Sequence, residues 1–330
     1  MTENKQTSPF EQLKQLGKQR LSELKELGTD LFKHISPKDL ATLLFPPALG
    51  LNILEGRLSG RAFKEDGFDP DAYDEQMVES VLNMARWWSM HYFHTKIFNV
   101  DKLPANRPAL LVGNHSAGLM PIDALFAINK IKDHYGKTQI VYPLVHDFAY
   151  MAPRVAKFAK RMGVLRASNS NAQAALLSGS HVLVYPGGDH DAFRTYSERK
   201  KIILANRKGF IRLALKTDVP IVPLVSVGLH EAFFVLSKGE NIAKKLGLKQ
   251  LLRTDVLPLS FSFPWGLVPA FFPYMPLPCS IEMQFCDPVY EKGSPDDNDL
   301  VDNIYNKVQN TMQLAMDELY QHRTPLLGRK

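Results

Sequence analysis

The chain has 330 residues, of which 45% are hydrophobic and 22% are charged, and its formal net charge is +6. This composition is typical of a globular protein with a sizeable core, and it excludes a disordered or fibrous chain. The modest basic excess suits anionic lipid headgroups, phosphorylated substrates or nucleic acid. Two cysteines, Cys279 and Cys286, belong to no metal or disulfide motif, which indicates a reducing compartment.

The first 75 residues are expected to form an N-terminal helical region. Residues 10–27 place leucines at helical spacing opposite a charged face, which predicts an amphipathic helix. Such a helix can lie on a membrane, on a partner or on its own domain. Residues 41–54 are apolar but short and interrupted by prolines, so we expect a docking segment. We expect neither a secretory signal nor an apolar span of about 20 residues.

Residues 76–330 are expected to form one α/β domain. After a long helix over Glu75–Phe98, apolar runs alternate with helical segments, which predicts a largely parallel central sheet flanked by helices. The expected strands are Ala109–Val112, Gln139–Leu144, His181–Tyr185, Ile221–Ser226 and Ser280–Phe285. The expected helices are Pro121–Asp133, Pro153–Met162, Asn169–Ser178, Asn206–Lys216 and a closing C-terminal helix over 297–322.

Residues 256–279 form an uncharged segment rich in proline and aromatic side chains. That much proline would break a membrane-spanning helix. The aromatic residues, Trp265, Phe271 and Phe272 among them, suit an apolar wall for acyl chains or a surface that dips into a bilayer. A covering layer over the core is the alternative.

The strongest candidate for catalysis lies between Gly113 and Asp123. His115 follows an apolar strand, and Asp123 lies on the next helical element, so the two have the parts of a His–Asp general base. Two alternatives stand beside this hypothesis. Asp123 suits a helix N-terminus on electrostatic grounds alone. Ser116 could be a hydrolase nucleophile, although Asn114 occupies the first glycine position of Gly-x-Ser-x-Gly.

A second candidate is the turn Pro186-Gly187-Gly188 after the strand over 181–185. Glycines let a backbone approach a ligand closely, and the N–H groups of Gly187 and Gly188 could bind a phosphate or an oxyanion. The neighbouring acids and His190 also suggest a metal. Their spacing matches no known zinc helix, so we expect no metal.

A third candidate is a basic segment. Residues 151–217 contain thirteen lysines and arginines but three acids, which favours an anionic substrate over an ordinary solvated surface. Arg166, Arg194, Arg199 and Lys200 are the candidates for an anion clamp. The segment lacks the context of a nucleic-acid-binding motif, so we expect no nucleic acid.

Four segments in order resemble the sequence blocks of the glycerolipid acyltransferase superfamily. Asn114-His115 through Asp123 resembles the catalytic His-x4-Asp block, and 163–168, 184–188 and 219–224 resemble the next three. The resemblance implies that His115 activates a hydroxyl without a covalent intermediate, that Asp123 orients it, and that Arg166 helps to hold the acceptor. It also implies a glycerolipid acceptor, no cofactor, and acyl-CoA or acyl carrier protein as co-substrate.

Two departures from the superfamily pattern leave the assignment open. Seven residues, not four, separate His115 from Asp123, so Asp147 is the alternative partner. Gly187 stands where members with phosphorylated acceptors usually carry Glu, and Pro-Gly-Gly is more similar to the diacylglycerol branch. We expect a peripheral or monotopic protein on the cytoplasmic side of a membrane. A non-catalytic lipid-binding protein would use the same surfaces without needing His115.

Overall fold

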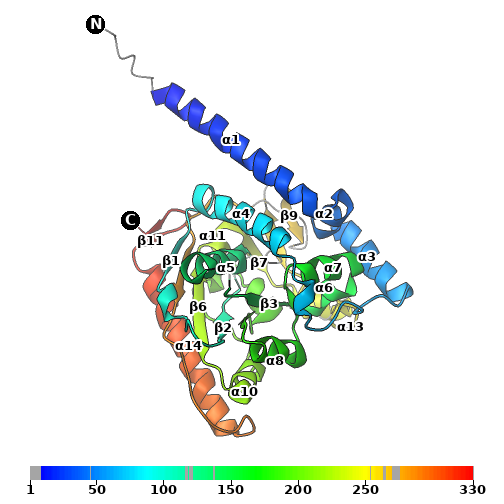
Figure 1. Ribbon diagram of the computed structural model, residues 1–330, viewed down its shortest axis with the longest axis vertical. Coiled ribbons are helices and arrows are strands. Elements are labelled where there is room, and N and C mark those ends of the chain that lie inside the picture. Colours follow the sequence, from blue (N-terminus) through cyan, green and yellow to red (C-terminus); the bar gives the residue numbers. More distant parts are fainter. Residues whose placement is uncertain are drawn as a thin grey trace.

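The computed structural model describes residues 9–44, 46–115, 118, 122–136, 138–252, 254–262, 265–269 and 276–329. A seven-stranded sheet forms the centre of an α/β domain, and helices cover both of its faces (Figure 1). The predicted fold, a largely parallel sheet flanked by helices with helical segments at both ends of the chain, is confirmed.

The central sheet has one antiparallel pair, in which β10 lies against β6; its other pairs are parallel. In spatial order its strands are β1 (Lys96–Phe98), β10 (Glu282–Phe285), β6 (Ile221–Val227), β2 (Leu110–Gly113), β5 (His181–Val184), β3 (Val141–Val145) and β4 (Leu165–Arg166). Strand β2 is central, with Val112 opposite Val184 of β5 and Gly113 opposite Leu224 of β6. The carboxyl ends of β2, β5 and β6 therefore lie at one edge of the sheet.

Side chains of β2 alternate between two hydrophobic cores, as the period of a strand requires. Leu110 and Val112 face the core that contains α8 (Asn169–Leu177), α10 (Gly209–Thr217) and α14 (Asn298–Tyr320). Ala109 and Leu111 face the core that contains α4 (Glu75–His91) and α5 (Ile122–Tyr135). Because both faces are covered, the central strands are continuous apolar runs, which is why they were predictable.

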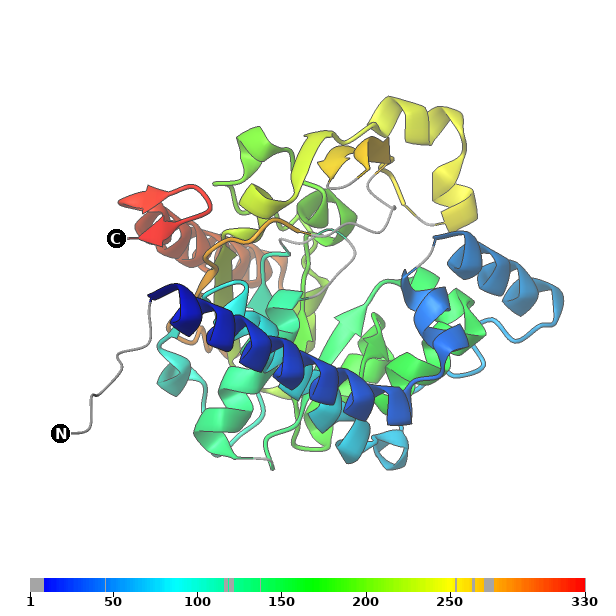
Figure 2. The same cartoon turned by 90° about the horizontal axis from the view of Figure 1, so that it is seen from above.

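The N-terminal helices run along the outside of the domain. The amphipathic helix α1 (Pro9–His34) packs on α4, while α2 (Pro37–Leu44) and α3 (Pro46–Leu58) pack on α7 (Pro153–Arg161), which follows the short α6 (Asp147–Met151). Figure 2 shows α1 lying across the domain, with α3 at one end. Within the described ranges, no helix is both long and apolar enough to cross a bilayer.

A second, three-stranded antiparallel sheet was not predicted. It consists of β7 (Phe234–Ser237), β8 (Leu259–Ser262) and β9 (Gly266–Pro269), and α12 (Glu240–Lys245) and α13 (Leu248–Leu252) lie between β7 and β8 in the chain. Part of the proline- and aromatic-rich segment thus forms strands, with Trp265 exposed beside them. Phe271 and Phe272 lie outside the described residues.

The predicted helix over Glu75–Phe98 is too long. Helix α4 ends at His91, His94 has a positive φ of 41°, and Lys96–Phe98 form the edge strand β1 instead. The closing helix is confirmed, and the Asp297 carboxylate caps it by accepting a hydrogen bond from the Leu300 N–H at 3.1 Å. A small hairpin of β11 (Arg323–Thr324) and β12 (Gly328–Arg329) follows.

Candidate active site

Asn114 fixes the chain at the point where β2 ends. Its Nδ2 donates to the Ser226 carbonyl at 2.9 Å, and its Oδ1 accepts from the Ser226 N–H at 2.8 Å. These bonds join the carboxyl ends of β2 and β6. They also satisfy both the nitrogen and the oxygen of the buried Asn114 side-chain amide. Asn114, predicted to bind substrate, therefore positions the residue that follows it, His115.

His115 is half-buried and has polar neighbours. Its backbone N–H donates to Asp191 Oδ2 at 2.5 Å, and its ring centroid lies 4.9 Å from that of Tyr185. Burial, with the nearby Arg194 charge, lowers the pKa of His115 to about 4. The imidazole is thus neutral at pH 7, as a general base must be before it accepts a proton.

Gly113 allows Tyr185 to approach this histidine. A Cβ at position 113 would lie 2.5 Å from Tyr185 Cε1, closer than any side chain tolerates. The pKa of the Tyr185 hydroxyl is raised well above its ordinary value by burial and then by the Asp123 carboxylate. Tyr185 therefore lies close to both the ring of His115 and the carboxylate of Asp123.

Asp123 is fully buried in the first turn of α5, where its Oδ1 accepts from the Ala124 N–H at 2.9 Å. Among the described residues, His115 Nδ1 has no hydrogen-bond partner, so this nitrogen makes no hydrogen bond to Asp123. Asp147, the alternative partner from the sequence, lies 3.2 Å from Arg166 instead.

Three residues form a buried group behind His115. Arg194 Nε lies 3.1 Å from Asp191 Oδ1 and 3.2 Å from His230 Nε2, and the arginine side chain is completely inaccessible. Arg194 Nη1 also donates to the Lys201 carbonyl. Burial raises the pKa of Asp191 to about 6, although the Arg194 charge opposes this shift. Arg194 is therefore an internal counter-charge rather than an open anion clamp.

Sequence reasoning did not assign Asp191 or His230 to the site. Asp191 lies in α9 (Gly188–Ala192), directly after the Pro-Gly-Gly turn, and His230 lies in α11 (Leu229–Ala232), three residues after β6. Their positions just beyond two predicted strands were the available signal, because the carboxyl ends of neighbouring parallel strands meet at one edge.

Unpaired buried polar atoms concentrate at this edge. Among the described residues, eleven buried side-chain atoms lack a hydrogen bond of normal geometry, and six of them belong to His115 and residues near it. The six are His115 Nδ1, Tyr185 Oη, Asp191 Oδ1, Arg194 Nη2, Ser226 Oγ and His230 Nδ1. Three of them still have a charged or polar neighbour, since Asp191 Oδ1 forms an ion pair with Arg194 Nε, Tyr185 faces the Asp123 carboxylate, and His230 faces the His115 backbone. An unpaired buried polar group typically costs about 1–3 kcal/mol. This concentration indicates a site built for a polar ligand.

The Pro-Gly-Gly turn packs tightly beside the site. A Cβ on Gly187 would lie 2.1 Å from the Ile203 carbonyl oxygen, and Gly188 has a φ of +54°, so both positions require glycine. The Gly188 N–H donates to the Tyr185 carbonyl at 3.1 Å. That group, predicted as an oxyanion or phosphate donor, is therefore already engaged.

The remaining predicted clamp residues contact other parts of the protein. Arg166 on β4 lies 2.6 Å from Asp66 and 3.2 Å from Asp147. The Arg199 guanidinium lies 4.0 Å from the Tyr196 ring centroid, and the Lys200 ammonium lies 5.2 Å from that of Tyr320. The expected convergence of these cations on one anion is not observed.

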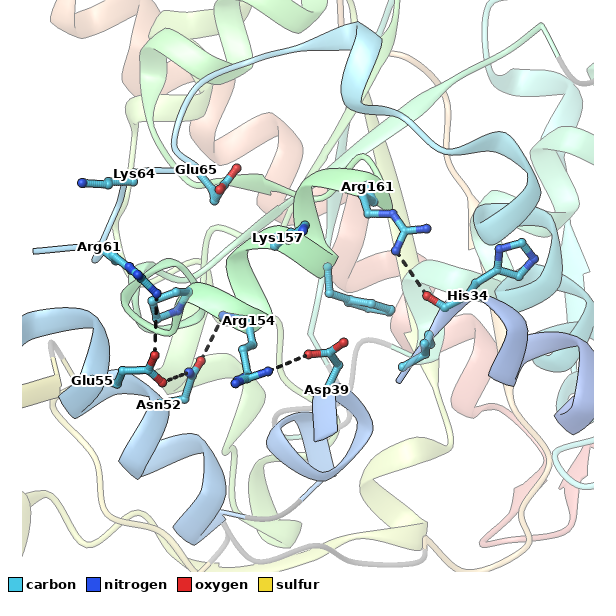
Figure 3. Close-up of a pocket in the computed structure, with 13 residues that line it drawn as sticks. His34, Asp39, Asn52, Glu55, Arg61, Lys64, Glu65, Arg154, Lys157 and Arg161 are labelled. Carbon is cyan, nitrogen blue, oxygen red and sulfur yellow. Dashed lines mark hydrogen bonds and ion pairs between the residues drawn. The ribbon is translucent and has the colours of Figure 1, made fainter. Parts of the chain in front are cut away.

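A separate cavity of about 610 Å³ lies between the N-terminal helices and α7. Figure 3 shows Arg154 pointing toward Asp39 at 3.6 Å, and the Arg154 backbone N–H donates to Asn52 Oδ1 at 3.0 Å. Its lining includes five cations and three carboxylates but no predicted site residue. These contacts join the N-terminal helices to the domain.

No group of three or more potential metal ligands occurs among the residues that the structure describes. Asp189, the first residue of the suggested metal group, accepts hydrogen bonds from Thr254 Oγ1 at 3.0 Å and from the Asp255 N–H at 3.1 Å. It therefore ties the turn to the segment that leads into the small sheet. Ser116, the alternative nucleophile, lies outside the described residues.

Comparison with known proteins defines the class of this protein as an O-acyltransferase of the glycerolipid type. The chain belongs to the diacylglycerol acyltransferase family, whose model matches residues 69–322. An uncharacterized protein of Mycobacterium tuberculosis is 28% identical over 289 residues, covering 86% of this chain and 76% of that protein.

Two further proteins are more distant. The human "DGAT1/2-independent enzyme synthesizing storage lipids" is 25% identical over 175 residues, covering 52% of each chain. Among solved structures, the 1-acyl-sn-glycerophosphate acyltransferase PlsC from Thermotoga maritima matches with 16% identity and a TM-score of 0.47. That match covers 85% of this chain and 95% of PlsC.

Proposed function

We propose that this protein transfers a fatty acyl group from acyl-CoA or acyl carrier protein to the free hydroxyl of an uncharged glycerolipid, with diacylglycerol as the best candidate. His115 is the general base. The acceptor hydroxyl attacks the thioester carbonyl carbon while its proton passes to His115, and the carbonyl becomes an oxyanion. Collapse of this intermediate breaks the carbon–sulfur bond, and the proton returns to the departing thiolate.

The choice of an uncharged acceptor rests on the surroundings of the predicted phosphate-binding arginines. Arg166 is paired with both Asp66 and Asp147, so the three side chains together carry a negative formal charge. Arg194 is buried against Asp191. A phosphorylated acceptor would have to displace a carboxylate from either arginine, whereas diacylglycerol would not.

Asp123 is the partner that we assign to the base. It is buried, its charge is favoured by the N-terminus of α5, and Tyr185 lies close to both its carboxylate and the His115 ring. A negative charge there stabilises the imidazolium that forms as the hydroxyl loses its proton.

Product analysis by mass spectrometry tests the reaction and its acceptor. Purified protein would receive oleoyl-CoA or oleoyl carrier protein with diacylglycerol, monoacylglycerol, lysophosphatidic acid or glycerol 3-phosphate. We expect triacylglycerol from diacylglycerol, and a rate about 100- to 10,000-fold lower for His115→Ala. Preferred acylation of a phosphorylated acceptor would overturn the acceptor assignment. Free fatty acid as the sole product would indicate a hydrolase.

Two aspartates give a matched test of the partner. Asp123→Asn should reduce kcat strongly, whereas Asp147→Asn, which only removes a charge from Arg166, should leave kcat within a few fold of wild type. The reverse result would assign Asp147 as the partner of His115.

We also propose that the protein binds membranes peripherally, through the side that carries α3, α12 and the small sheet. Figures 1 and 2 both place α13 beside α3. Nine apolar side chains on these elements are more than half exposed: Leu51, Leu54, Leu58, Leu236, Ile242, Leu246, Phe261, Trp265 and Leu267. The exposed Lys244 and Lys245 on α12 add charge complementary to anionic lipid.

Co-sedimentation with vesicles of phosphatidylcholine and phosphatidylglycerol tests this surface. Phe261→Glu combined with Trp265→Glu should release the protein from the vesicles. Leu314→Glu is the control, because Leu314 is equally exposed but lies on α14, at the opposite side of the domain (Figure 1). Equal binding by all three proteins would disprove the membrane surface.

A further inference from the structure

The cavity beside α7 lies outside the candidate active site. Its volume is about 610 Å³, within the range of about 300–1,000 Å³ that is usual for ligand pockets. Apart from His34, its charged lining consists of five cations and three carboxylates. The positive charge is therefore in excess, which favours an anionic ligand over a neutral one.

One face of α7 supplies three of these cations. Arg154, Lys157 and Arg161 follow one another at intervals of three and four residues, so their side chains lie on the same side of the helix. The buried residues of α7 are apolar and lie on its other side. The helix thus packs on the domain through its apolar side and presents its cations to the cavity (Figure 3).

The arginines at the two ends of this face differ in how their donors are used. Arg161 is closely paired, since its Nη2 lies 2.6 Å from Asp74 and its Nη1 donates to the His34 carbonyl at 3.2 Å. Among the described residues, Arg154 has only Asp39 as a counter-ion, at 3.6 Å, which is too long for a hydrogen bond. The Arg154 guanidinium therefore retains unused donors.

Three further cations of the cavity are also available. Arg61 lies 3.9 Å from Glu55, again beyond hydrogen-bond distance. Lys64 and Lys157 are exposed, and within the described ranges neither makes an ion pair or a side-chain hydrogen bond. Four cations at one cavity thus have donors that no described protein group accepts.

The nearby carboxylates are held by other partners. Glu55 accepts from Asn52 Nδ2 at 3.1 Å, and Asp39 accepts from Ser36 Oγ at 2.6 Å. Asn52 is buried, and its Oδ1 accepts from the Arg154 backbone N–H at 3.0 Å. Packing of α3 against α7 therefore fixes these groups and leaves the guanidinium of Arg154 able to bind another anion.

We propose that this cavity is a second binding site, for a phosphate group. A guanidinium can donate two parallel hydrogen bonds to phosphate oxygens, and the two lysines supply further positive charge. The inference goes beyond the proposed acyl transfer and does not depend on it, because no residue of the candidate active site lines the cavity.

Two sources of phosphate would present the same chemistry, a membrane phospholipid and a soluble phosphate ester. Helix α3 contributes Asn52 and Glu55 to the cavity and also carries the exposed Leu51, Leu54 and Leu58. A bilayer in contact with these leucines would bring phospholipid headgroups to the cavity. A lipid and a free phosphate must therefore be compared as ligands.

Isothermal titration calorimetry tests the site with two probes, inorganic phosphate and dihexanoyl phosphatidic acid below its micelle concentration. Arg154→Gln and Lys157→Gln each remove one cation and should weaken binding about 10- to 100-fold. Lys216→Gln is the matched control and should bind as the wild type does. Lys216 lies on α10, is exposed, and makes no ion pair among the described residues.

Glu55→Gln should act in the opposite direction. The substitution removes a competing negative charge from Arg61, while the amide oxygen of glutamine can still accept from Asn52. Binding should therefore tighten about 2- to 5-fold, as expected for one partly exposed charge. Weaker binding by this variant would contradict a site for an anion.

The two probes separate the sources. Phosphatidic acid that binds at least about 10-fold more tightly than inorganic phosphate would identify a phospholipid site, whereas equal affinities would identify a site for a soluble phosphate ester. Equal binding by the wild type, Arg154→Gln and Lys157→Gln would overturn the inference, as would the absence of binding of both probes. None of these outcomes bears on acyl transfer, which is measured separately.

Lysine acetylation locates the bound phosphate without any substitution. Phosphatidic acid should slow the reaction of Lys64 and Lys157 with acetic anhydride and leave that of Lys216 unchanged, as measured by peptide mass spectrometry. Unchanged rates at all three lysines would overturn the inference even if calorimetry detected binding, because the ligand would then lie elsewhere.

Discussion

Two consecutive residues, His230 and Glu231, belong to buried polar groups of opposite character. Glu231 accepts two hydrogen bonds from Arg323 at 2.9 Å and a third from the Leu326 N–H at 2.8 Å. Glu282 completes this second group, since it pairs with Arg323 at 3.0 Å and with Arg329 at 3.2 Å. The group around His115 and His230 instead contains six of the eleven buried atoms in the described chain that lack a hydrogen bond of normal geometry.

Two neighbouring residues on one turn of helix therefore belong to groups with different roles. The group of Glu231 stabilises the fold, whereas the group of His230 lies at the candidate site. The Glu231 group is saturated, so removal of a member leaves a buried charge without compensation. The His230 group is only partly satisfied, so its poorly aligned polar atoms cost stability in the free protein. The Glu231 group holds α11 in place and thereby fixes the position of His230.

Breaking the saturated group should have the largest effect on stability. Arg323→Met leaves two buried carboxylates with one partly exposed arginine, and loss of a buried partner typically costs about 3–5 kcal/mol. We expect this loss in the free energy of unfolding, measured by urea denaturation. A loss below about 1 kcal/mol would contradict the assignment of this group to stability.

Acid should destabilise the protein through His181, a buried histidine whose two ring nitrogens are both hydrogen-bonded. Burial lowers the pKa of His181 to about 4 from 6.5. The unfolded chain therefore binds a proton below pH 6.5 that the folded chain refuses until about pH 4, and stability falls as pH falls through this window. Asp191, with its raised pKa, acts in the opposite direction between 3.8 and about 6.

The His181→Gln variant isolates this contribution. The difference in unfolding free energy between wild type and variant should shrink by up to about 3 kcal/mol between pH 6.5 and pH 4. A difference that does not change with pH would show that folding does not shift the pKa of His181.

Crowding the His230 group should have a smaller effect on stability. Gly113→Ala places a methyl group 2.5 Å from the Tyr185 ring, which must shift against His115. Overpacking of this kind costs about 1–3 kcal/mol, and we expect kcat to fall as well. Gly28→Ala in α1 meets no atom within 4 Å and should be neutral or slightly stabilising. Thermal melting and the acyl-transfer assay would compare the two variants.

A surface ion pair gives the smallest expected effect. Lys307 lies 2.8 Å from Glu291, but both side chains are exposed. Lys307→Met should therefore change the unfolding free energy by about 0–1 kcal/mol. An effect equal to that of Arg323→Met would mean that burial does not determine the strength of these pairs.

The sequence was most informative where a residue's role depends on its own segment. Strands β2, β5 and β6 were predictable because a strand buried on both faces is apolar throughout. His115 and Asp123 were singled out as candidates because they follow such a strand. Strands β1 and β4 were missed because they are only three and two residues long, too short to show a strand pattern in the sequence.

The contacts between side chains of the site could not be predicted from the sequence, because they join residues that lie far apart in the chain. The basic segment predicted an anion clamp, yet the segment does not reveal that Asp66, about 100 residues before Arg166, lies against it. Likewise, nothing near His230 indicates that Arg194 reaches its Nε2. Local pattern identified the strand ends, and long-range packing determined which side chains meet there.

The hairpin β11–β12 couples residues 323–329 to the candidate site. Arg323 lies 92 positions after Glu231, and it follows every strand of the central sheet and the helix α14. Without the docked hairpin, Glu231 and Glu282 would lack their buried counter-ion. The position of α11 therefore depends on a segment that lies outside the central sheet.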